Sequence, residues 1–550
     1  MNIGSRKHIL IVSDDIVDSN MGGVGVRNWE LSHTLASQCD VTLAIPNKTQ
    51  LTSESIEIIT YARNAQDLRS IAQSVDVILV QGFVLHFQPY LAELQTPLAV
   101  DLYVPSLLES LVWHDNAQWD TWIPEYEEYL RVQHELLRYG DFFFCASERQ
   151  RDYWLGWIHA QKRINPHTYR QSPTLRSLID VVPFGISGDP PPSSPAVLKG
   201  IHPNIKPSDK VVLWSGGIWD WLDPLSLIRA VALLVPQHPE IKLFFMGTRH
   251  PNPVVRGMSM PEDAKKLSEE VDLLDKNIFF GDWTPYQERG RYLAESDLAV
   301  ISHPDHIETH FSFRTRVLDC IWAGLPIIST RGDTLAEWIA SNRIGLVIPP
   351  NDVTAMADAI LKLLNSKGKP SINQSFEELR KQLQWDIVAE PLIQFCLNPT
   401  IAPDKGLYLT ETERNSRDKD AFLAKVIREK DAHTEQVIQE KDAFLAQVVR
   451  DKDAFFEQVV RDKDVKLDQV VQEMDAKLDQ VIREKDARLE LTIQEKDSAR
   501  EQALQDQQVH LQNIIDGKDA IINRQQQQIE KYQRSFPLRV YAAIKRLVGR

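Results

Sequence analysis

The sequence is poor in cysteine and lacks any apolar run near the ~20 residues that a membrane-spanning helix needs. Its four cysteines stand far apart, without the spacing of a zinc site or of a disulfide framework. The N-terminus also lacks the long apolar region and the cleavage site of a signal peptide. We therefore expect a cytoplasmic protein with buried, reduced thiols, namely Cys39, Cys145, Cys320 and Cys396.

An excess of positive charge is lacking as well. The formal net charge is -15 over 550 residues, which argues against nucleic acid as a partner, because phosphate binding requires a basic face. The hydrophobic fraction of 43% and the charged fraction of 25% are ordinary for soluble globular protein. At ~100–200 residues per domain, the length predicts two or three folded units besides any extended part.

Two series of short apolar runs alternate with helical patterns. The first is HILIVS, DVTLAI, VDVILVQG, PLAVDLY, DFFFCAS and IDVVPFG, and the second is KVVLWSGG, IKLFFMG, NIFFGDW, DLAVIS, LPIISTRG and GLVIPP. Such runs are typical of parallel strands covered on both faces. The fold class is therefore α/β, with two Rossmann-like domains. The first comprises residues 1–187, and the second comprises residues 205–398 and includes the closing helices. A proline-rich linker, residues 188–204, separates them, and a ligand cleft is expected between them.

A repeat follows a second linker, residues 399–417. Within residues 418–534, Lys-Asp recurs in an eleven-residue register, in which Met474 and Gln507 replace the Lys at two positions. The Lys residues are Lys419, Lys430, Lys441, Lys452, Lys463, Lys485, Lys496 and Lys518. The apolar residues of each unit, such as Phe444 and Val448, form one stripe of a helix at ~98° per residue. This predicts a long α-helical, coiled-coil-like stalk that forms a homo-oligomer. Because the Lys lies near the middle of the stripe, a single solvated helix is the alternative.

The last segment, residues 535–550, contains no acidic residue and combines basic with apolar side chains. This composition suits an amphipathic helix lying on an anionic membrane surface. A short capping helix is the alternative interpretation.

A glycine-rich loop precedes the first predicted helix, in MGGVGVRNWELSHTLA. Gly23 and Gly25 would let backbone N–H groups approach a phosphate at the positive helix N-terminus. The spacing differs from GxGxxG and from the Walker A pattern, which argues against a simple dehydrogenase and a P-loop enzyme. A plain turn is the alternative.

A second polar segment is HPDHIETHFSFRTRVLDCIWAGLPIISTRGD, residues 303–333. Arg314 and Arg316 could clamp a diphosphate through paired N–H donors. Asp319 could accept hydrogen bonds from hydroxyl groups, and Glu308 and His310 lie nearby in the sequence. A salt-bridged surface helix is the alternative.

These segments resemble family 4 glycosyltransferases, retaining enzymes of the GT-B fold, over about residues 7–397. The resemblance depends on GGVGVRNWELSHTLA, VVPFG, WSGGIWDWLDPLSLIRA and LDCIWAGLPIIST. It implies that the second domain holds a nucleotide-sugar donor and the first domain holds a saccharide or lipid-linked acceptor. It further implies hexosyl transfer with retention and neither a cofactor nor a metal.

The resemblance also implies roles for individual residues. Asp319 matches the carboxylate that holds the nucleotide ribose in the family. The paired Glu of the E-x7-E signature would fall on Phe311, so we expect Glu308 or His310 to replace it. Asp101, at the end of a predicted strand, would contact sugar in the cleft, or else cap the next helix.

The family's Arg and Lys that grip the donor diphosphate are missing from SGGIWDWLDP. We expect Arg314, Arg316 and Arg249 to substitute for them, because the leaving diphosphate must be stabilised. The predicted catalytic residues are Asp101, Glu308 and His310, and the predicted donor-binding residues are Gly23, Gly25, Arg249, Arg314, Arg316 and Asp319.

The function that we predict is glycosyl transfer in cell-surface polysaccharide or lipid-linked saccharide synthesis, peripheral to the inner face of the plasma membrane. One alternative is a sugar-nucleotide epimerase of the same architecture. The other is a non-enzymatic assembly or spacer protein with a nucleotide-sugar-binding head.

Overall fold

The computed structural model describes residues 6–405 and 407, except 64, 66, 114–118, 249–251, 253–256 and 367–369, together with scattered residues between 430 and 496. The chain divides into two units, Met1–Ala421 and Phe422–Arg550, each of which is considered by itself. The predicted tail, residues 535–550, lies outside the described residues.

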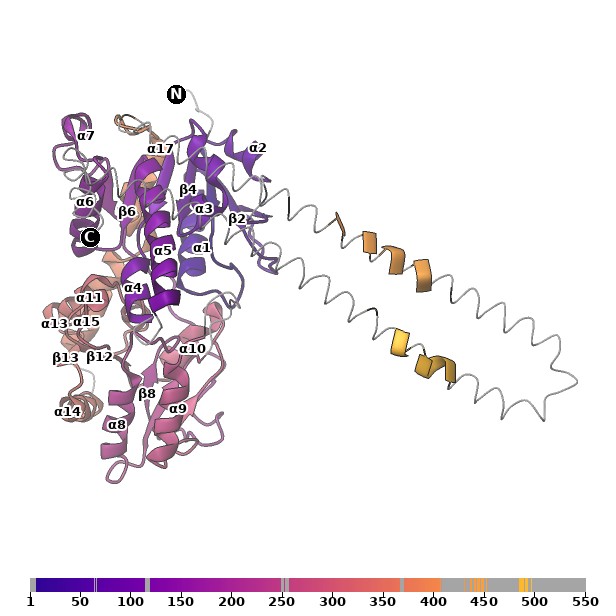
Figure 1. Cartoon of the computed structure of the whole chain (residues 1–550). Helices are drawn as coiled ribbons and strands as arrows, with labels where there is room; N and C mark the ends of the chain where they lie inside the picture. The colour runs from indigo at the N-terminus through magenta and orange to yellow at the C-terminus, as the bar shows by residue number, and fades with distance from the viewer. Residues whose placement is uncertain are drawn as a thin grey trace, which may run out of the picture. The chain divides into compact units, whose positions relative to one another are not determined.

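The first unit contains two parallel sheets (Figure 1). The first sheet has seven strands in the order β3-β2-β1-β4-β5-β6-β7. Their bounds are β1 (His8–Val12), β2 (Asp40–Ile45), β3 (Glu57–Thr60), β4 (Val77–Gln81), β5 (Leu98–Asp101), β6 (Phe142–Cys145) and β7 (Ile179–Val181). Each apolar run of the first predicted series forms a strand, and in all of these strands except β7 most residues are buried. The prediction missed β3, whose side chains are exposed or half-buried.

Helices cover this sheet and connect its strands. They are α1 (Gly23–Ala36), α2 (Arg69–Ala72), α3 (Val84–Phe87), the 3-10 turn η1 (Pro89–Glu93), α4 (Ser106–Trp113), α5 (Trp119–Tyr139), α6 (Glu148–Ala160) and α7 (Pro166–Gln171). Ser147 caps α6 by accepting the N–H of Gln150, and Asn165 caps α7 in a capping box with Thr168. Strand order and helices together give a Rossmann-like first domain.

The second sheet has six strands in the order β10-β9-β8-β11-β12-β13, and its pairings are parallel. The strands are β8 (Lys210–Trp214), β9 (Ile241–Phe245), β10 (Ile278–Phe280), β11 (Leu298–Ile301), β12 (Ile327–Thr330) and β13 (Gly345–Ile348). The helices are α8 (Pro224–Leu234), α9 (Met260–Glu270), η2 (Tyr286–Glu288), α10 (Arg289–Ala294), α11 (Ile307–Phe311), α12 (Arg316–Ala323), α13 (Thr334–Asn342), α14 (Val353–Leu364) and α15 (Pro370–Gln382). The second predicted series is therefore confirmed as strands.

The connection between the domains is fixed against the second domain. The carboxylate of Glu295 accepts the N–H groups of Val197, Leu198 and Lys199, and the Leu198 side chain is buried. The proline-rich segment therefore has a defined path, although it contributes no strand.

The final helices, α16 (Trp385–Val388) and α17 (Glu390–Leu397), return to the first domain (Figure 1). The Phe395 ring stacks on Phe142 with centroids 4.8 Å apart, and Trp385 lies 5.0 Å from Phe184. Beyond α17, Asp404 forms a buried ion pair with Arg163 at 2.8 Å. Residues 385–405 thus pack on the first domain. The prediction had instead placed the closing helices with the second domain, up to residue 398, and had begun a linker at residue 399.

In the second unit, the described residues between 430 and 496 are helical and exposed or half-buried. Phe444 and Val449, which belong to the predicted apolar stripe, are 64% and 56% exposed. Helical pairing of the repeat therefore stays a prediction. No described helix is long and apolar enough to cross a membrane. All four cysteines are buried and unbonded, as predicted.

Candidate active site

A cleft of about 650 Å³ lies between the two domains. The loops after β1, β4 and β5 line it from the first domain, and the loops after β8, β9 and β10 line it from the second. Open α/β sheets bind ligands at the carboxyl ends of their strands, where successive loops diverge. Both sheets direct that edge at the cleft, so this is the candidate active site.

The guanidinium of Arg316, at the start of α12, lies against the glycine loop after β8. Its Nη2 donates to the carbonyl of Gly217, and its Nε is 3.2 Å from where a Cβ of Gly216 would lie. Gly216 also has a φ of +98°, so glycine is favoured there both by this backbone conformation and by the close approach of Arg316. Arg316 lines the cleft and forms no ion pair with a described carboxylate, although the charge of Asp319 acts on it from farther away and opposes the loss of its proton. Burial, together with the nearby Arg314, lowers the pKa of Arg316 to about 9, which leaves it charged at neutral pH.

Arg314 and Glu308, which were predicted for donor binding and for catalysis, form a buried, two-pronged ion pair. Nη1 and Nη2 of Arg314 donate to the two carboxylate oxygens of Glu308 at 2.8 and 2.6 Å. Burial opposes the charge of Arg314, but the Glu308 carboxylate outweighs it and raises the pKa of Arg314. Arg314 lines the cleft, whereas Glu308 is fully buried behind it. The contact therefore favours a positioning role for Glu308 over direct catalysis.

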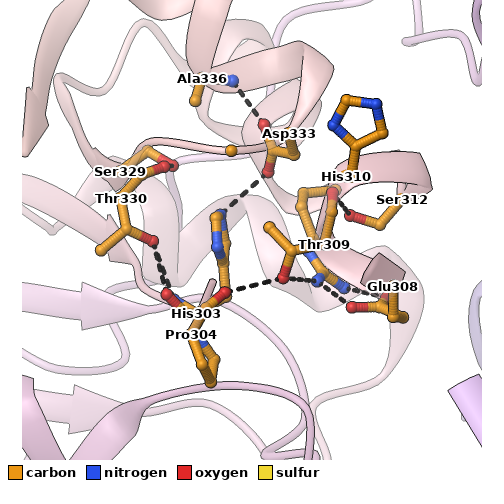
Figure 2. A network of polar contacts seen from close by, with 12 residues as sticks. His303, Pro304, Glu308, Thr309, His310, Ser312, Ser329, Thr330, Asp333 and Ala336 are labelled. Carbon is orange, nitrogen blue, oxygen red and sulfur yellow. Dashed lines mark hydrogen bonds and ion pairs between the residues drawn. The ribbon is translucent and has the colours of Figure 1, made fainter. Parts of the chain in front are cut away.

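A second buried contact lies beside this pair. Nε2 of His303 is 3.1 Å from Oδ2 of Asp333, and both side chains are fully buried. Thr330 accepts the N–H of His303 and donates to its carbonyl. Figure 2 shows the imidazole of His310 turned away from this network, and His310 is exposed. The structure therefore does not bring His310 together with the cleft residues.

Asp319, the predicted ribose contact, lines the cleft and pairs with a residue that the sequence reasoning missed. Nε of Arg289 lies 2.9 Å from its Oδ1. The Arg289 guanidinium lies 3.7 Å from the ring centre of Tyr286 and 4.5 Å from that of Trp322. Contact with the two rings restricts the direction of the guanidinium and hence the position of the carboxylate.

Asp101, the remaining predicted catalytic residue, is 4% exposed at the end of β5. Its Oδ2 accepts from Nε of the fully buried Arg27 at 2.5 Å, and its Oδ1 accepts the N–H of Tyr103 at 3.0 Å. Arg27 also donates to the carbonyls of Val182 and Pro183. Asp101 reaches the cleft lining with its carboxylate already engaged, which favours a positioning role for it.

The two predicted glycines differ in placement. Gly23 lines the cleft at the first residue of α1, and a Cβ there would lie 3.3 Å from the Tyr103 hydroxyl. Gly25 is buried, and its Cβ would lie 2.3 Å from the carbonyl oxygen of Ile16. Gly25 is therefore explained by packing of α1 against the preceding loop. The predicted donor residue Arg249 lies outside the described residues.

Indole rings surround the glycine loop. Trp219 stacks on Trp221 at 5.2 Å with planes 5° apart. A Cβ at Gly217 would lie 3.0 Å from the Trp283 ring and 3.5 Å from that of Trp219. The missing side chain of Gly217 thus leaves room between two indoles at the cleft, a shape suited to a flat or ring-shaped ligand.

Contacts across the cleft hold the two domains together. Asn252 donates to Oδ1 of Asp15 at 2.6 Å, and the Tyr286 hydroxyl donates to Glu30 at 2.8 Å. Arg149 of α6 reaches the carbonyls of His310 and Gly332. Among the described residues, no group of His, Cys, Asp or Glu side chains is placed to hold a metal ion.

Comparisons with known proteins agree with this geometry. Residues 209–366 match the family described as Glycosyl transferases group 1. The second domain is therefore similar to this family over most of its length. The matched residues include the glycine loop after β8, Arg314, Arg316 and Asp319, so the resemblance to glycosyltransferases that was predicted for this half of the chain is supported.

The chain is also similar to curated proteins over part of its length. It is 24% identical over 202 residues to the D-inositol 3-phosphate glycosyltransferase of Corynebacterium urealyticum. The aligned segment covers 36% of this chain and 45% of the relative. It is 26% identical over 198 residues to the protein of that name from Corynebacterium efficiens, with the same two coverages. The chain thus spans about half the length of the curated relatives it matches.

Among solved structures, the sucrose-phosphate synthase of Thermosynechococcus elongatus superimposes with a TM-score of 0.52. The match covers 71% of this chain and 98% of the other, at 16% identity. At this identity the likeness shows the fold alone, an α/β GT-B-like arrangement of two parallel sheets.

Proposed function

We propose that the protein transfers a hexosyl group from a nucleotide-sugar donor, held by the second domain, to a saccharide or lipid-linked acceptor held by the first. The acceptor hydroxyl oxygen bonds to the anomeric carbon as the bond from that carbon to the diphosphate oxygen breaks. The electron pair leaves with the nucleoside diphosphate, and the hydroxyl proton passes to that diphosphate or to solvent.

The observation that carries the proposal is the position of Arg316. Its guanidinium lies against Gly216 and Gly217 at the cleft, and the nearby Asp319 acts on its charge without forming an ion pair with it. A charged group held this way is stabilised by an incoming anion, and charge-assisted donors stabilise a leaving diphosphate. The helix α12 also begins at Arg316, so its partial positive charge adds to that of the side chain.

Arg316 supplies the charge that SGGIWDWLDP lacks. The family's arginine is missing from the loop after β8, yet Arg316 places a guanidinium against that same loop from the start of α12. Asp319, oriented by Arg289, would accept hydrogen bonds from the ribose hydroxyls. This arrangement supports donor binding by a different set of side chains from the family pattern.

The finer parts of the proposal concern the outcome and the setting of the reaction. We propose transfer with retention and without a metal, in cell-surface polysaccharide or lipid-linked saccharide synthesis at the cytoplasmic face of the membrane. The repeat of residues 418–534 would position and oligomerise the enzyme, and the basic segment 535–550 would bind anionic lipid. The composition of these segments supports the proposal.

Donor binding tests the central claim. Calorimetric titration of the full chain with UDP-, GDP- and ADP-sugars should identify a donor, and mass spectrometry should detect transfer to a saccharide. Arg316→Ala should weaken nucleoside diphosphate binding about 10- to 100-fold, since a hydrogen bond to a charged group contributes about 1.5–3 kcal/mol. Arg229→Ala, which removes an exposed arginine of α8, is the matched control. Equal affinity of wild type and Arg316→Ala would remove the central support for this function.

Vesicle binding tests the membrane setting. The full chain should sediment with vesicles containing phosphatidylserine, and a chain lacking residues 535–550 should not. Equal sedimentation of both proteins would place the membrane contact elsewhere.

A further inference from the structure

The first-domain wall of the cleft holds two buried amides without partners. Gln81, the last residue of β4, is 4% exposed, and Gln133, on α5, is 3% exposed. Both side chains line the cleft, and neither Nε2 has a hydrogen-bond partner among the described residues. Because an unpaired buried donor is costly, these two N–H₂ groups point to a ligand that accepts hydrogen bonds.

The same wall carries hydrogen-bond acceptors. Asp14 follows β1, and its Oδ2 accepts the N–H of Phe83 at 2.9 Å. Its Oδ1 is buried and has no hydrogen-bond partner among the described residues. Gly82 permits this approach, since a Cβ there would lie 2.7 Å from the Asp14 carboxylate. Glu109 of α4 lines the cleft as well. The wall therefore offers donors and acceptors together, as hydroxyl groups require.

The wall also offers an aromatic surface. The ring of Tyr129, on α5, meets Phe83 edge to face at 5.1 Å and lines the cleft. Aromatic rings pack against the apolar C–H face of a ligand while polar neighbours bind its hydroxyl edge. A sugar or cyclic polyol presents both kinds of surface.

The charges on this wall disfavour an anion. Its cation, Arg63, lies 3.7 Å from Oδ1 of Asp14, donates to the Asp14 carbonyl and stacks over Phe87 at 5.4 Å. The carboxyl groups of Asp14 and Glu109 face the same space, and burial raises the pKa of both. A phosphate brought beside them would meet like charge wherever either carboxyl group ionises, and it would find Arg63 already beside Asp14. Binding sites use such unfavourable charge to reject wrong partners.

We propose that Asp14, Gln81, Glu109 and Gln133 form an acceptor subsite for an uncharged, polyhydroxylated ring, such as the unphosphorylated end of a saccharide. This inference rests on the proposed glycosyl transfer and narrows its acceptor class to neutral polyols, excluding acceptors whose reacting ring carries a phosphate.

Direct binding tests the subsite separately from catalysis. Saturation-transfer NMR on the full chain would compare matched pairs: glucose with glucose 6-phosphate, and inositol with inositol 3-phosphate. In each pair the neutral member should bind at least about tenfold more tightly. Equal or tighter binding of the phosphorylated members, or no binding of a neutral sugar, would overturn the inference.

Variants locate the binding. Gln133→Leu and Asp14→Asn should each weaken binding of the neutral ligand about tenfold or more and leave UDP, GDP and ADP binding unchanged. The matched controls are Gln237→Leu and Asp272→Asn, both exposed and away from the cleft. Neutral-ligand binding that survives both cleft variants would contradict the inference. If the wild-type chain binds the neutral ligand but none of UDP, GDP and ADP, that result would count against the proposed function alone.

Discussion

Arg289 donates from Nε to Oδ1 of Asp319 at 2.9 Å, and both side chains line the donor side of the cleft. The Asp319 carboxylate raises the pKa of Arg289 against the opposing effect of burial. Tyr286, which stacks on this guanidinium, also donates to Glu30 of the first domain. The carboxylate expected to hold ribose is thus positioned by a chain of contacts that reaches across the cleft.

Arg289→Ala should therefore weaken nucleotide-sugar binding about tenfold, because Asp319 loses the charged hydrogen bond that orients it. Arg289→Lys should recover part of the affinity, since a lysine restores the charge but not the flat, stacked geometry. Titration calorimetry with a nucleoside diphosphate and with its sugar conjugate measures both effects. If Arg289→Ala binds donor normally and only loses thermal stability, the pair serves the fold.

The glycine loop before α1 gives a stability prediction. Gly25→Ala should destabilise the protein by about 1–3 kcal/mol, the usual cost of overpacking, because its Cβ would overlap the Ile16 carbonyl. Gly23→Ala should leave stability nearly unchanged, since the contact with Tyr103 is at 3.3 Å, and should affect turnover instead. Urea denaturation and transfer assays separate the two variants. Equal stability of both would show that the loop relaxes.

Glu109 gives a pH prediction. Burial is the largest cause that raises its pKa from 4.5 to about 8, and the nearby Glu308 adds to it. The folded state then holds a proton that the unfolded state has released, so this group's contribution to stability is lost as the pH rises from about 4.5 to about 8. Glu109→Gln should remove that loss and be the more stable protein at pH 9, by on the order of 1–3 kcal/mol.

Urea denaturation at pH 5, 7 and 9 measures this difference. Glu269→Gln, an exposed carboxylate of α9, is the control and should follow wild type. Parallel stability profiles of wild type and Glu109→Gln would show that the Glu109 carboxyl is not protonated in this range.

The sequence predicted the sheets well because buried parallel strands are continuous apolar runs with little ambiguity. The strand β3 was not predicted, because its sequence EIIT lies at the sheet edge with side chains exposed or half-buried. It therefore lacks the continuous apolar run of a buried strand. The site was predicted in part. Arg316 and Asp319 were identified from residue type and position near a helix start, and both line the cleft.

Other site residues depend on contacts that no local pattern encodes. Arg289 acts on a carboxylate 30 positions away, and Gln81 and Gln133 matter only because the fold leaves their amides unpaired. Glu308 lies close to Arg314 in the sequence, but the two side chains meet only because the chain turns after α11. Their ion pair occupies the Glu308 carboxylate. The sequence of a short polar segment shows which residue types are present, but it does not show which of their side chains form hydrogen bonds or ion pairs with one another.

The end of the globular part gives the last prediction. The sequence favours a linker from residue 399, and a chain ending near Pro399 would then retain turnover of a soluble acceptor. In the structure, Asp404 pairs with Arg163 at 2.8 Å, with 0% and 5% of their side chains exposed. Ala402 and Lys405 also donate to the Asp141 carboxylate. A chain ending at residue 399 leaves Arg163 buried without its partner.

We therefore expect a chain ending at residue 407 to be as stable as the globular part of the full protein and to keep turnover of a soluble acceptor. The chain ending at 399 should lose about 3–5 kcal/mol, the usual cost of breaking a buried ion pair. Asp404→Asn in the full chain should reproduce much of that loss, because it removes the same charge and leaves the repeat in place. Urea denaturation and a transfer assay provide the measurements. Equal stability of the two shortened chains would make residues 400–407 dispensable, whereas a stable but inactive chain ending at 407 would give the repeat a part in catalysis.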